Sequence, residues 1–338
     1  MMNMMFIKNL LMKNMIIIMN SIILLIMIMN NNLMMNWLLM EMSTMMSISL
    51  INLKSNKLSS IIYYFISSIS SILLMSMLIM YIKSNLLIEH YYNLFNLLIY
   101  FSLFLKIGIF PFSYWMIYIY ELLSWYEIFF MSTFMKFIPL YMYMSIIQFN
   151  MKIFIYLMMN SMLISLYSYK FYSLKKIIAC SSINQMSFFI ILMNFNKTLS
   201  LLYMMLYLIL IFMMSSIMNN LNLNKKIDFI FYNNNNNKMN MYIYMMIMLI
   251  YSMLPPFFSF IMKWMFFMEM SKLFFNSLLM LLLMSSILMI WNYLNILENS
   301  IFYMKTMKKQ LNKKFNLINS IMINLIFNMI LFMLFNNY

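Results

Sequence analysis

Turn-forming residues and cysteine are almost missing from this sequence. Its 338 residues include one glycine, four prolines and one cysteine. With so few turn residues, and no ten-residue alternation of apolar and polar positions, the pattern excludes a β-barrel. The lone cysteine, Cys180, cannot form an intrachain disulfide or supply a cysteine metal cluster. Only 9% of the residues are charged, which excludes an ordinary soluble globular domain.

Apolar residues make up 65% of the chain and recur in runs of about twenty. Each run is long enough to cross the roughly 30 Å of hydrocarbon in a bilayer. We therefore predict an all-α polytopic membrane protein that forms one transmembrane domain over residues 1–338. Eleven spans are predicted, at about 10–29, 33–53, 59–82, 93–110, 124–148, 152–169, 177–195, 199–219, 240–265, 273–297 and 316–336. The segment 111–123 is too short to span and is predicted to be interfacial or a broken helix.

Arginine is absent, so all 22 basic residues are lysine. The net charge of +15 would suggest nucleic acid if these lysines shared a surface, but they stand singly between apolar runs. In the eleven-span topology, fifteen lysines lie on the side of the N-terminus and four on the other side. The remaining three lie within spans. This asymmetry fits the positive-inside rule, and the prediction is a membrane partner, lipid headgroups included, with no nucleic acid.

Valine is also absent and alanine occurs once, at Ala179, whereas Asn, Ile, Lys and Met are abundant. The missing residues have GC-rich codons, so the usage indicates an AT-rich genome. Fifty-two methionines exceed what ATG alone would supply, which indicates a mitochondrial code that reads ATA as Met. The N-terminus lacks the Arg and Ser of a transit peptide, as expected of an inner-membrane protein made inside the organelle.

Four charges fall well inside the predicted spans: Glu41, Lys106, Lys136 and Lys263. A charge at such depth costs about 2.5–3.5 kcal/mol on insertion scales, so it indicates function. A row of these groups can exchange protons, which is the chemistry of a proton path. Two alternatives stay open: Lys106 could reach the interface with its long side chain, or the charges could pair and fix helix contacts. Three lysines and one glutamate cannot all pair.

The spacing of the spans predicts two five-span repeats, about 10–148 and 152–297, followed by a C-terminal helix at about 316–336. Because five is odd, the second repeat would be inverted relative to the first. The fourth span of each repeat carries helix breakers, Gly108 and Pro111 in one and Pro255 and Pro256 in the other. Paired broken helices in inverted repeats are typical of transporters.

The other polar residues give weaker signals. The run Ser181–Ser187 is rich in hydrogen-bonding side chains, which could line a water channel or join helices. Glu121 and Glu127 flank the start of the fifth span and are predicted to be interfacial, with a role in proton uptake as the alternative. His90 is predicted to be a surface residue. We find no metal-ligand set, phosphate loop or nucleophile pattern, so no cofactor or redox centre is expected in this chain. Three further acidic residues are predicted to be loop charges: Asp228, Glu269 and Glu298.

Five segments resemble, in order, the motifs of the antiporter-like subunits of respiratory complex I. Lys106–Trp115 (KIGIFPFSYW) resembles K-x-G-x-x-P-F-H-x-W, and Phe134–Pro139 (FMKFIP) resembles W-Q-K-x-x-P. Lys176–Met186 (KIIACSSINQM) resembles K-x-x-A-Y-S-S-I-x-H-M. Leu254–Trp264 (LPPFFSFIMKW) resembles L-P-P-F-x-G-F-x-x-K-W, and Trp37–Met42 (WLLMEM) resembles an early glutamate helix. Together these segments cover roughly residues 37–264, so the resemblance is specific.

The resemblance implies a proton-translocating membrane-arm subunit in the mitochondrial inner membrane, with its N-terminus in the matrix and its C-terminus in the intermembrane space. It implies that Glu41 and Lys106 form a coupling pair, that Lys136 is the central relay and that Lys263 is the terminal lysine. The implied partners are other membrane-arm subunits, including a neighbouring antiporter-like one. NADH, FMN, Fe–S clusters and ubiquinone would be held by partner subunits.

The chain departs from the family motifs at two positions that could otherwise titrate. Ser113 and Gln185 stand where histidine is usual, and neither side chain can exchange protons near neutral pH. Ser187 and Ser259 replace expected glycines. Two rival functions fit the same pattern, a stand-alone cation/proton antiporter and a purely structural module of the membrane arm.

Overall fold

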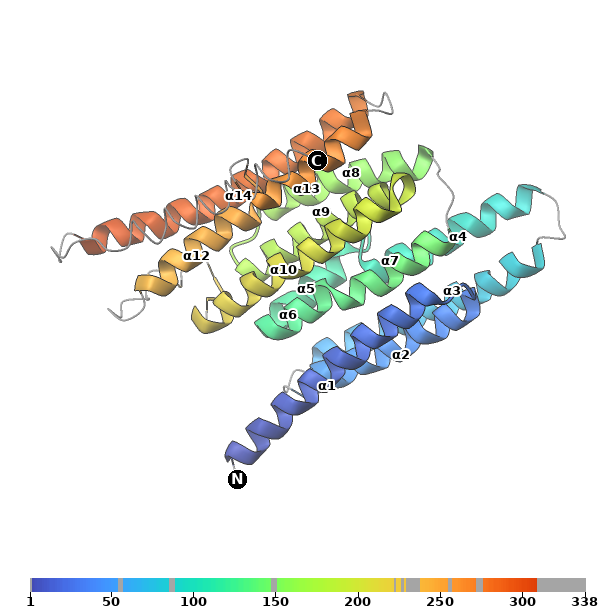
Figure 1. The fold of residues 1–338 in the computed structure, drawn as a ribbon, viewed down its shortest axis with the longest axis horizontal. Coiled ribbons are helices and arrows are strands. Elements are labelled where there is room, and N and C mark those ends of the chain that lie inside the picture. The colour runs from blue at the N-terminus through green and yellow to red at the C-terminus, as the bar shows by residue number, and fades with distance from the viewer. Residues whose placement is uncertain are drawn as a thin grey trace. The chain divides into compact units, whose positions relative to one another are not determined.

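The computed structural model describes residues 2–53, 57–84, 89–146, 151–221, 223–225, 228, 238–254, 257–271 and 276–308. Within these ranges the regular secondary structure is helical, which confirms the all-α prediction. Contacts divide the chain into two compact units, Met1–Asn150 and Met151–Tyr338. The order of the helices along the chain can be followed in Figure 1.

The described residues of the first unit form four long helices followed by three short ones. They are α1 (Met2–Met29), α2 (Leu33–Asn52), α3 (Lys57–Ser84), α4 (Glu89–Ile107), α5 (Ser113–Leu122), α6 (Trp125–Ser132) and α7 (Phe134–Ile146). Helix α3 packs against α2 and α4, and α7 packs against α1, α2 and α4. The helices that carry Glu41 and Lys106 therefore both pack against the helix that carries Lys136.

The second unit is organised around one buried helix. Its helices are α8 (Met151–Ser168), α9 (Leu174–Phe195), α10 (Lys197–Leu221), α12 (Lys238–Tyr251), α13 (Phe258–Ser271) and α14 (Asn276–Lys308). In α9, 94% of the most apolar window is buried, against 39% in α10, so α9 is the core helix. It packs against α8, α10 and α13. The polar residues of α9 are thus held inside the unit.

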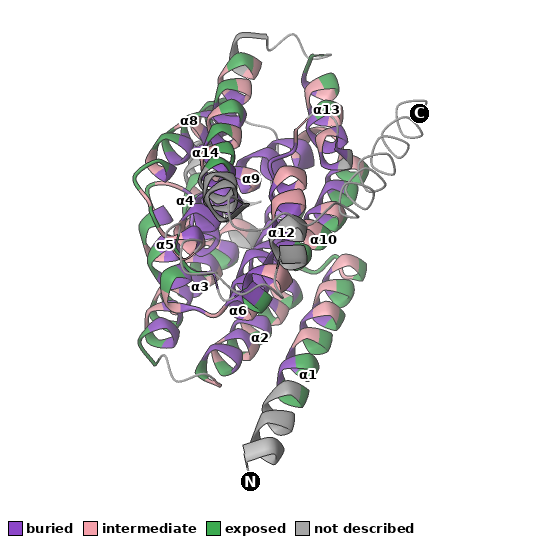
Figure 2. Ribbon diagram, turned by 90° about the vertical axis from the view of Figure 1, so that its left-hand side faces the viewer, coloured by how far each residue is buried: buried purple, intermediate pink, exposed green. Residues whose placement is uncertain are grey.

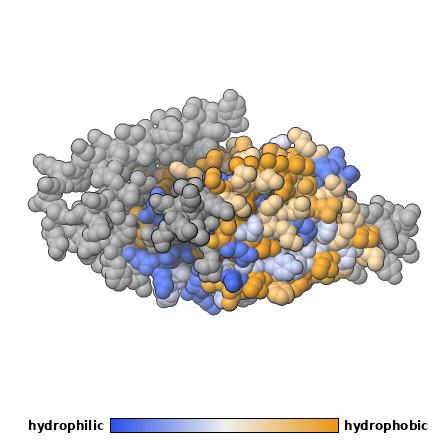
Figure 3. All heavy atoms as spheres, turned by 90° about the horizontal axis from the view of Figure 1, so that it is seen from below, coloured by the Kyte–Doolittle hydropathy of each residue, from blue (hydrophilic) through white to orange (hydrophobic). Residues whose placement is uncertain are grey.

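The outer helices expose apolar rather than charged residues. On α10, Met205, Ile209 and Phe212 are 63%, 58% and 53% exposed, and they recur at helical spacing. On α1, Leu11 and Met15 are exposed to the same degree. Figure 2 shows exposed residues along these helices, and Figure 3 shows apolar residues over much of the described surface in its view. Extended apolar faces of this kind match a lipid environment.

Six described helices are long and apolar enough to cross a membrane: Leu11–Met29, Lys57–Tyr81, Met151–Ser168, Leu174–Phe195, Lys197–Leu221 and Leu279–Glu298. The shorter segment Phe95–Ile107 is also apolar. The total of eleven spans stays a prediction, because the predicted span 316–336 lies outside the described residues. The two inverted repeats also stay a prediction.

The helix interruptions match the prediction at two places and differ at a third. Helix α4 ends at Ile107 before α5 begins at Ser113, and α12 ends at Tyr251 before α13 begins at Phe258. The predicted span 124–148 contains a break that was not predicted, because α6 and α7 are separated at Thr133. Thr133 has non-helical dihedral angles (φ −111°, ψ −88°), and its hydroxyl donates to the Phe129 carbonyl at 2.7 Å. A local bond of this kind competes with the helix ladder.

Candidate functional site

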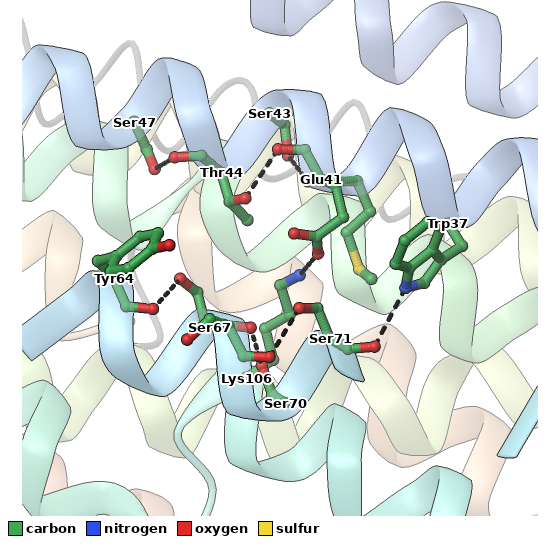
Figure 4. Close-up of polar contacts among 12 residues, drawn as sticks. Trp37, Glu41, Ser43, Thr44, Ser47, Tyr64, Ser67, Ser70, Ser71 and Lys106 are labelled. Atoms are coloured by element: carbon green, nitrogen blue, oxygen red, sulfur yellow. Dashed lines mark hydrogen bonds and ion pairs between the residues drawn. The ribbon is translucent and has the colours of Figure 1, made fainter. Parts of the chain in front are cut away.

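Glu41 and Lys106 form a direct ion pair between α2 and α4. The Lys106 Nζ lies 2.8 Å from Glu41 Oε1, and the two side chains are 3% and 22% exposed. The pair is drawn in Figure 4, where the Lys106 amine points at the carboxylate. A charge-assisted hydrogen bond of this length is among the strong ones. The contact argues against the alternative that Lys106 reaches towards the interface.

Small hydroxyl side chains surround this pair. In Figure 4 the α3 residues Ser67, Ser70 and Ser71 lie beside it, and α3 packs against both α2 and α4. Each of these serines donates to a carbonyl three residues earlier in α3, at 3.0, 2.8 and 2.9 Å respectively. Their donors are therefore satisfied inside the apolar unit, while their oxygens retain lone pairs that can accept a hydrogen bond. These oxygens could accept a hydrogen bond from the Lys106 ammonium if it moved away from Glu41.

The end of α4 fixes the position of Lys106. Gly108 has φ +78°, and its backbone N–H and that of Ile109 donate to the Phe104 carbonyl at 2.9 and 3.0 Å. Glycine is the residue that adopts this left-handed conformation without a steric penalty, and it commonly terminates helices. Lys106 thus lies in the last turn of α4, where the carbonyl ends of the helix favour a cation.

Replacing Gly108 by alanine is expected to destabilise this helix end by about 1–2 kcal/mol, the penalty of a left-handed conformation for an L-residue. A Cβ at this position would also meet Met116 at 3.1–3.2 Å. Thermal denaturation of the intact protein checks the prediction. The double variant Gly108→Ala/Met116→Ala is the control, because it removes the contacts with Sδ and Cε of Met116, leaves the one with its Cβ, and keeps the unfavourable φ. Full recovery in that variant would contradict the backbone explanation.

Lys136 lies on α7 and is fully buried. The helix begins two residues earlier, after the break at Thr133, and the Lys136 backbone N–H donates to the Thr133 carbonyl at 3.0 Å. Its Nζ lies 5.9 Å from the centre of the Tyr120 ring on α5, close enough for a cation–π interaction. The structure therefore places this lysine beside a helix break, with an aromatic face near its charge.

Lys263 lies on α13 of the second unit and is 5% exposed. Helix α13 begins after the interruption that follows α12, where Met253 has a positive φ of 55°. Among the residues that the structure describes, no carboxylate pairs with Lys263. A buried ammonium is unfavourable unless it is paired and hydrogen-bonded, so Lys263 is a candidate functional residue. Pro255 and Pro256 lie outside the described residues.

Glu127, which was predicted to be interfacial, is 3% exposed within the protein. Its Oε2 accepts from the Ser124 backbone N–H at 2.8 Å, in a capping box at the start of α6. Within the described part of the chain its Oε1 has no hydrogen-bond partner. The Ser124-x-x-Glu127 spacing is a capping-box signature, and it could have identified this helix start from the sequence. Glu121 is exposed, and the side chain of His90 lies outside the described residues.

The polar run on α9 divides into two kinds of contact. Ser187 donates to a carbonyl of its own helix, at Asn184. Ser181 also donates within α9, to the Ile178 carbonyl at 2.9 Å, but its Oγ lies 3.0 Å from the Tyr251 hydroxyl on α12. Gln185 Oε1 accepts from the Tyr203 hydroxyl on α10. Of the two interpretations of this run, these contacts favour hydrogen bonding between helices.

The sequence is similar to known respiratory-chain proteins over most of its length. Residues 30–288 match the family model described as NADH:quinone oxidoreductase/Mrp antiporter, transmembrane. NADH-ubiquinone oxidoreductase chain 2 of Apis mellifera ligustica is 48% identical over 250 residues, which are 73% of each chain. The corresponding chain of Anopheles gambiae is 31% identical over 274 residues, 77% of this chain and 76% of that one.

The fold is similar to membrane subunits of solved complexes. A chain of respiratory complex I from Thermus thermophilus with bound aureothin superposes with a TM-score of 0.76 at 14% identity, covering 86% of this chain and 70% of that one. A chain of the Mrp complex from Dietzia gives a TM-score of 0.63 at 13% identity, covering 77% and 55%. At these identities the likeness concerns the fold alone, and it identifies an antiporter-like membrane fold.

Proposed function

Because this chain belongs to the NADH:quinone oxidoreductase/Mrp antiporter transmembrane family, we propose that it is a proton-translocating membrane-arm subunit of a mitochondrial NADH:ubiquinone oxidoreductase, in the position of chain 2. Electron transfer from NADH to quinone would occur in partner subunits. This chain would use the released free energy to move protons across the membrane.

The observation that carries this proposal is the ion pair between Lys106 and Glu41 at the end of an interrupted helix. The pair joins α2 to α4, and α4 stops directly after Lys106. A short movement at this break would separate the two charges. Separation leaves two charges in an apolar setting, which is costly, and proton transfer relieves that cost. Opening and closing of the pair can thus couple a conformational change to proton movement.

The other two buried lysines supply the remaining relay positions in this proposal. Lys136 on α7 would receive the proton in the first unit, since α7 packs against both α2 and α4. Lys263 on α13 would act in the second unit, where no described carboxylate holds its charge. Both lysines follow helix interruptions, and broken helices expose backbone polar groups that stabilise ions and water.

The proposed partners and location follow from the same reasoning. We place the chain in the inner mitochondrial membrane, with its N-terminus in the matrix and its C-terminus in the intermembrane space. Its neighbours would be other membrane-arm subunits, one of them antiporter-like, and lipids against the apolar faces of α1 and α10. NADH, FMN, iron–sulfur clusters and ubiquinone would bind in partner subunits and not in this chain.

A native gel of solubilised inner membranes, stained for NADH oxidation and followed by mass spectrometry of the active band, tests the assignment. We expect this chain to migrate with the NADH-oxidising band. If it migrates alone, or with an inactive band, a stand-alone cation/proton antiporter becomes the better function. Proton transport in liposomes that lack the NADH-oxidising partners would then be the next measurement.

A further inference from the structure

The interruption between α12 and α13 contains a backbone conformation that an L-residue rarely adopts. Met253 has φ +55°, in the left-handed region that favours glycine. Its side chain and that of its neighbour Ser252 are buried, so this part of the interruption lies inside the second unit. A residue stays in such a conformation where the surrounding contacts determine the backbone. The contacts at this interruption should therefore fix its shape.

The core helix α9 contacts the end of α12 through two polar side chains that lie one turn apart. Ser181 donates its hydroxyl proton to the Ile178 carbonyl, so its Oγ accepts from the Tyr251 hydroxyl at 3.0 Å. Tyr251 is the last residue of α12. Gln185 Nε2 lies 3.6 Å from Met253 Sδ, within the interruption itself. These two contacts hold the end of α12 against the core of the unit.

Ser259, the second residue of α13, reaches back across the interruption. Its hydroxyl donates to the Ile250 carbonyl, in the last turn of α12, at 2.5 Å. Ser252 and Ser271 donate instead to carbonyls three residues earlier in the chain. The last carbonyls of a helix lack partners within that helix, and the Ile250 carbonyl also accepts from the Met253 backbone N–H at 3.1 Å. Ser259 thus joins the start of α13 to the end of α12.

Lys263 lies on the same face of α13 as Ser259, between two points at which that face is held. Ser259, Lys263 and Phe266 are four and three residues apart, which is the spacing of one helix face. All three are buried, whereas Trp264 is 47% exposed. The Phe266 ring meets the Phe188 ring of α9 edge to face, with centroids 5.0 Å apart. The bond to α12 and the ring contact with α9 therefore lie on either side of Lys263.

We propose that Ser259 is a positioning residue for Lys263, because its bond to the Ile250 carbonyl sets where the first turn of α13 lies. The inference rests on the proposed function, in which Lys263 relays protons. Proton transfer requires a donor and an acceptor within hydrogen-bond reach, about 2.6–3.2 Å apart, so a displaced helix start would take Lys263 out of reach. Ser259 itself gives up no proton.

The bond is a feature of this chain rather than of the family motif. Ser259 stands where the motif has glycine, which has no side chain that could reach the Ile250 carbonyl. A serine at this position is therefore not required for the helix interruption to form. Its hydroxyl adds a contact across the interruption, one turn before the buried lysine.

A purely structural role for Ser259 predicts a different result from a positioning role. If the hydroxyl only satisfies a buried carbonyl, its removal lowers stability, and any effect on pumping adds to that of removing Lys263. If Ser259 acts through Lys263, its removal has no further effect on pumping once the lysine is gone. Two residues that act as a unit are non-additive in this way.

The test measures protons pumped per electron pair in the assembled complex, reconstituted in proteoliposomes, for Ser259→Ala, Lys263→Met and the double variant. We expect Ser259→Ala to lower the yield by no more than Lys263→Met does, and the double variant to match Lys263→Met. Ser252→Ala is the matched control, because Ser252 is a buried serine at the same interruption that donates to the Leu249 carbonyl, and its yield should be unchanged.

The outcomes separate this inference from the proposed function. A full yield in Ser259→Ala with a lowered yield in Lys263→Met would overturn the inference and leave the proposed function standing. A double variant that falls below Lys263→Met, or an equal loss in Ser252→Ala, would also overturn it. A full yield in Lys263→Met would count against the proposed function.

Two further variants at the same position keep the test decisive. Ser259→Thr retains the hydroxyl and should recover the yield, and an assembled threonine variant that stays as low as Ser259→Ala would overturn the inference. Where Ser259→Ala assembles poorly, Ser259→Gly takes its place, because the family motif carries glycine there. The glycine variant should also lose yield, and a full yield in it would overturn the inference.

Discussion

Replacing Lys136 by methionine is expected to lower the number of protons pumped per electron pair while the subunit still assembles. Methionine is similar in length to lysine and carries no charge or transferable proton. Loss of a positioned acid or base typically slows proton transfer by a factor of about 10²–10⁴, which would silence the path through this subunit. The measurement is the proton yield during NADH oxidation in proteoliposomes. A full yield in the assembled variant would remove Lys136 from the relay.

The stability of the same variant should not fall, because Lys136 is fully buried. Replacing buried charged residues by apolar ones of similar volume is often neutral or stabilising. Lys197→Met is the matched control: this lysine is exposed at the start of α10, and its replacement should change neither quantity. Replacing Lys136 is thus predicted to lower the proton yield without lowering the stability of the protein. If the subunit is a purely structural module, the proton yield should be unchanged in Lys136→Met.

The sequence was most informative where a residue type has a special backbone property. The single glycine and Pro111 predicted the end of α4, and the structure ends that helix at Ile107 with Gly108 at positive φ. The break at Thr133 was missed because threonine is compatible with a helix, and its effect depends on one local hydrogen bond. Breaks caused by side-chain bonding have a weaker sequence signal than those caused by Gly or Pro.

Burial was harder to predict than helix location. Glu127 is one turn from a predicted helix start, and its position there does not show which face of α6 it occupies. The tyrosine contacts were also beyond the sequence. Tyr203 bonds Gln185 and Tyr251 bonds Ser181, and each pair joins helices whose packing no local pattern specifies. With 25 tyrosines in the chain, spacing alone selects none of them.

The contact between Lys106 and Glu41 could not be derived from the composition of the chain either. Composition indicated only that three lysines and one glutamate cannot all pair, and the resemblance to a family suggested which two would. The structure places Lys106 and Glu41 in contact, 65 residues apart in the sequence, through the packing of α3 against both of their helices. The contact is a property of the tertiary structure. Its two side chains are unequally exposed, so removing one or the other should have different consequences.

Removing either charge of the pair is expected to lower the stability of the protein, by different amounts for Glu41 and Lys106. Glu41→Gln leaves the Lys106 ammonium, whose side chain is 3% exposed, without its counter-charge, whereas Lys106→Met leaves a carboxylate on a side chain that is 22% exposed. Removing one partner of a fully buried pair costs about 3–5 kcal/mol. We therefore expect a loss near this range for Glu41→Gln. For Lys106→Met we expect roughly half of it, since solvent can screen Glu41.

The double variant Glu41→Gln/Lys106→Met separates stability from function. It contains no unpaired charge, so its thermal denaturation temperature should return close to that of the unmodified complex. Its proton yield should stay low, because neither side chain can exchange a proton. Thermal denaturation and proton yield, measured on the same preparations, check both statements. Recovery of the yield together with stability would mean that the pair only holds α2 against α4. Recovery of stability alone would identify the pair as the element that couples helix movement to proton transfer.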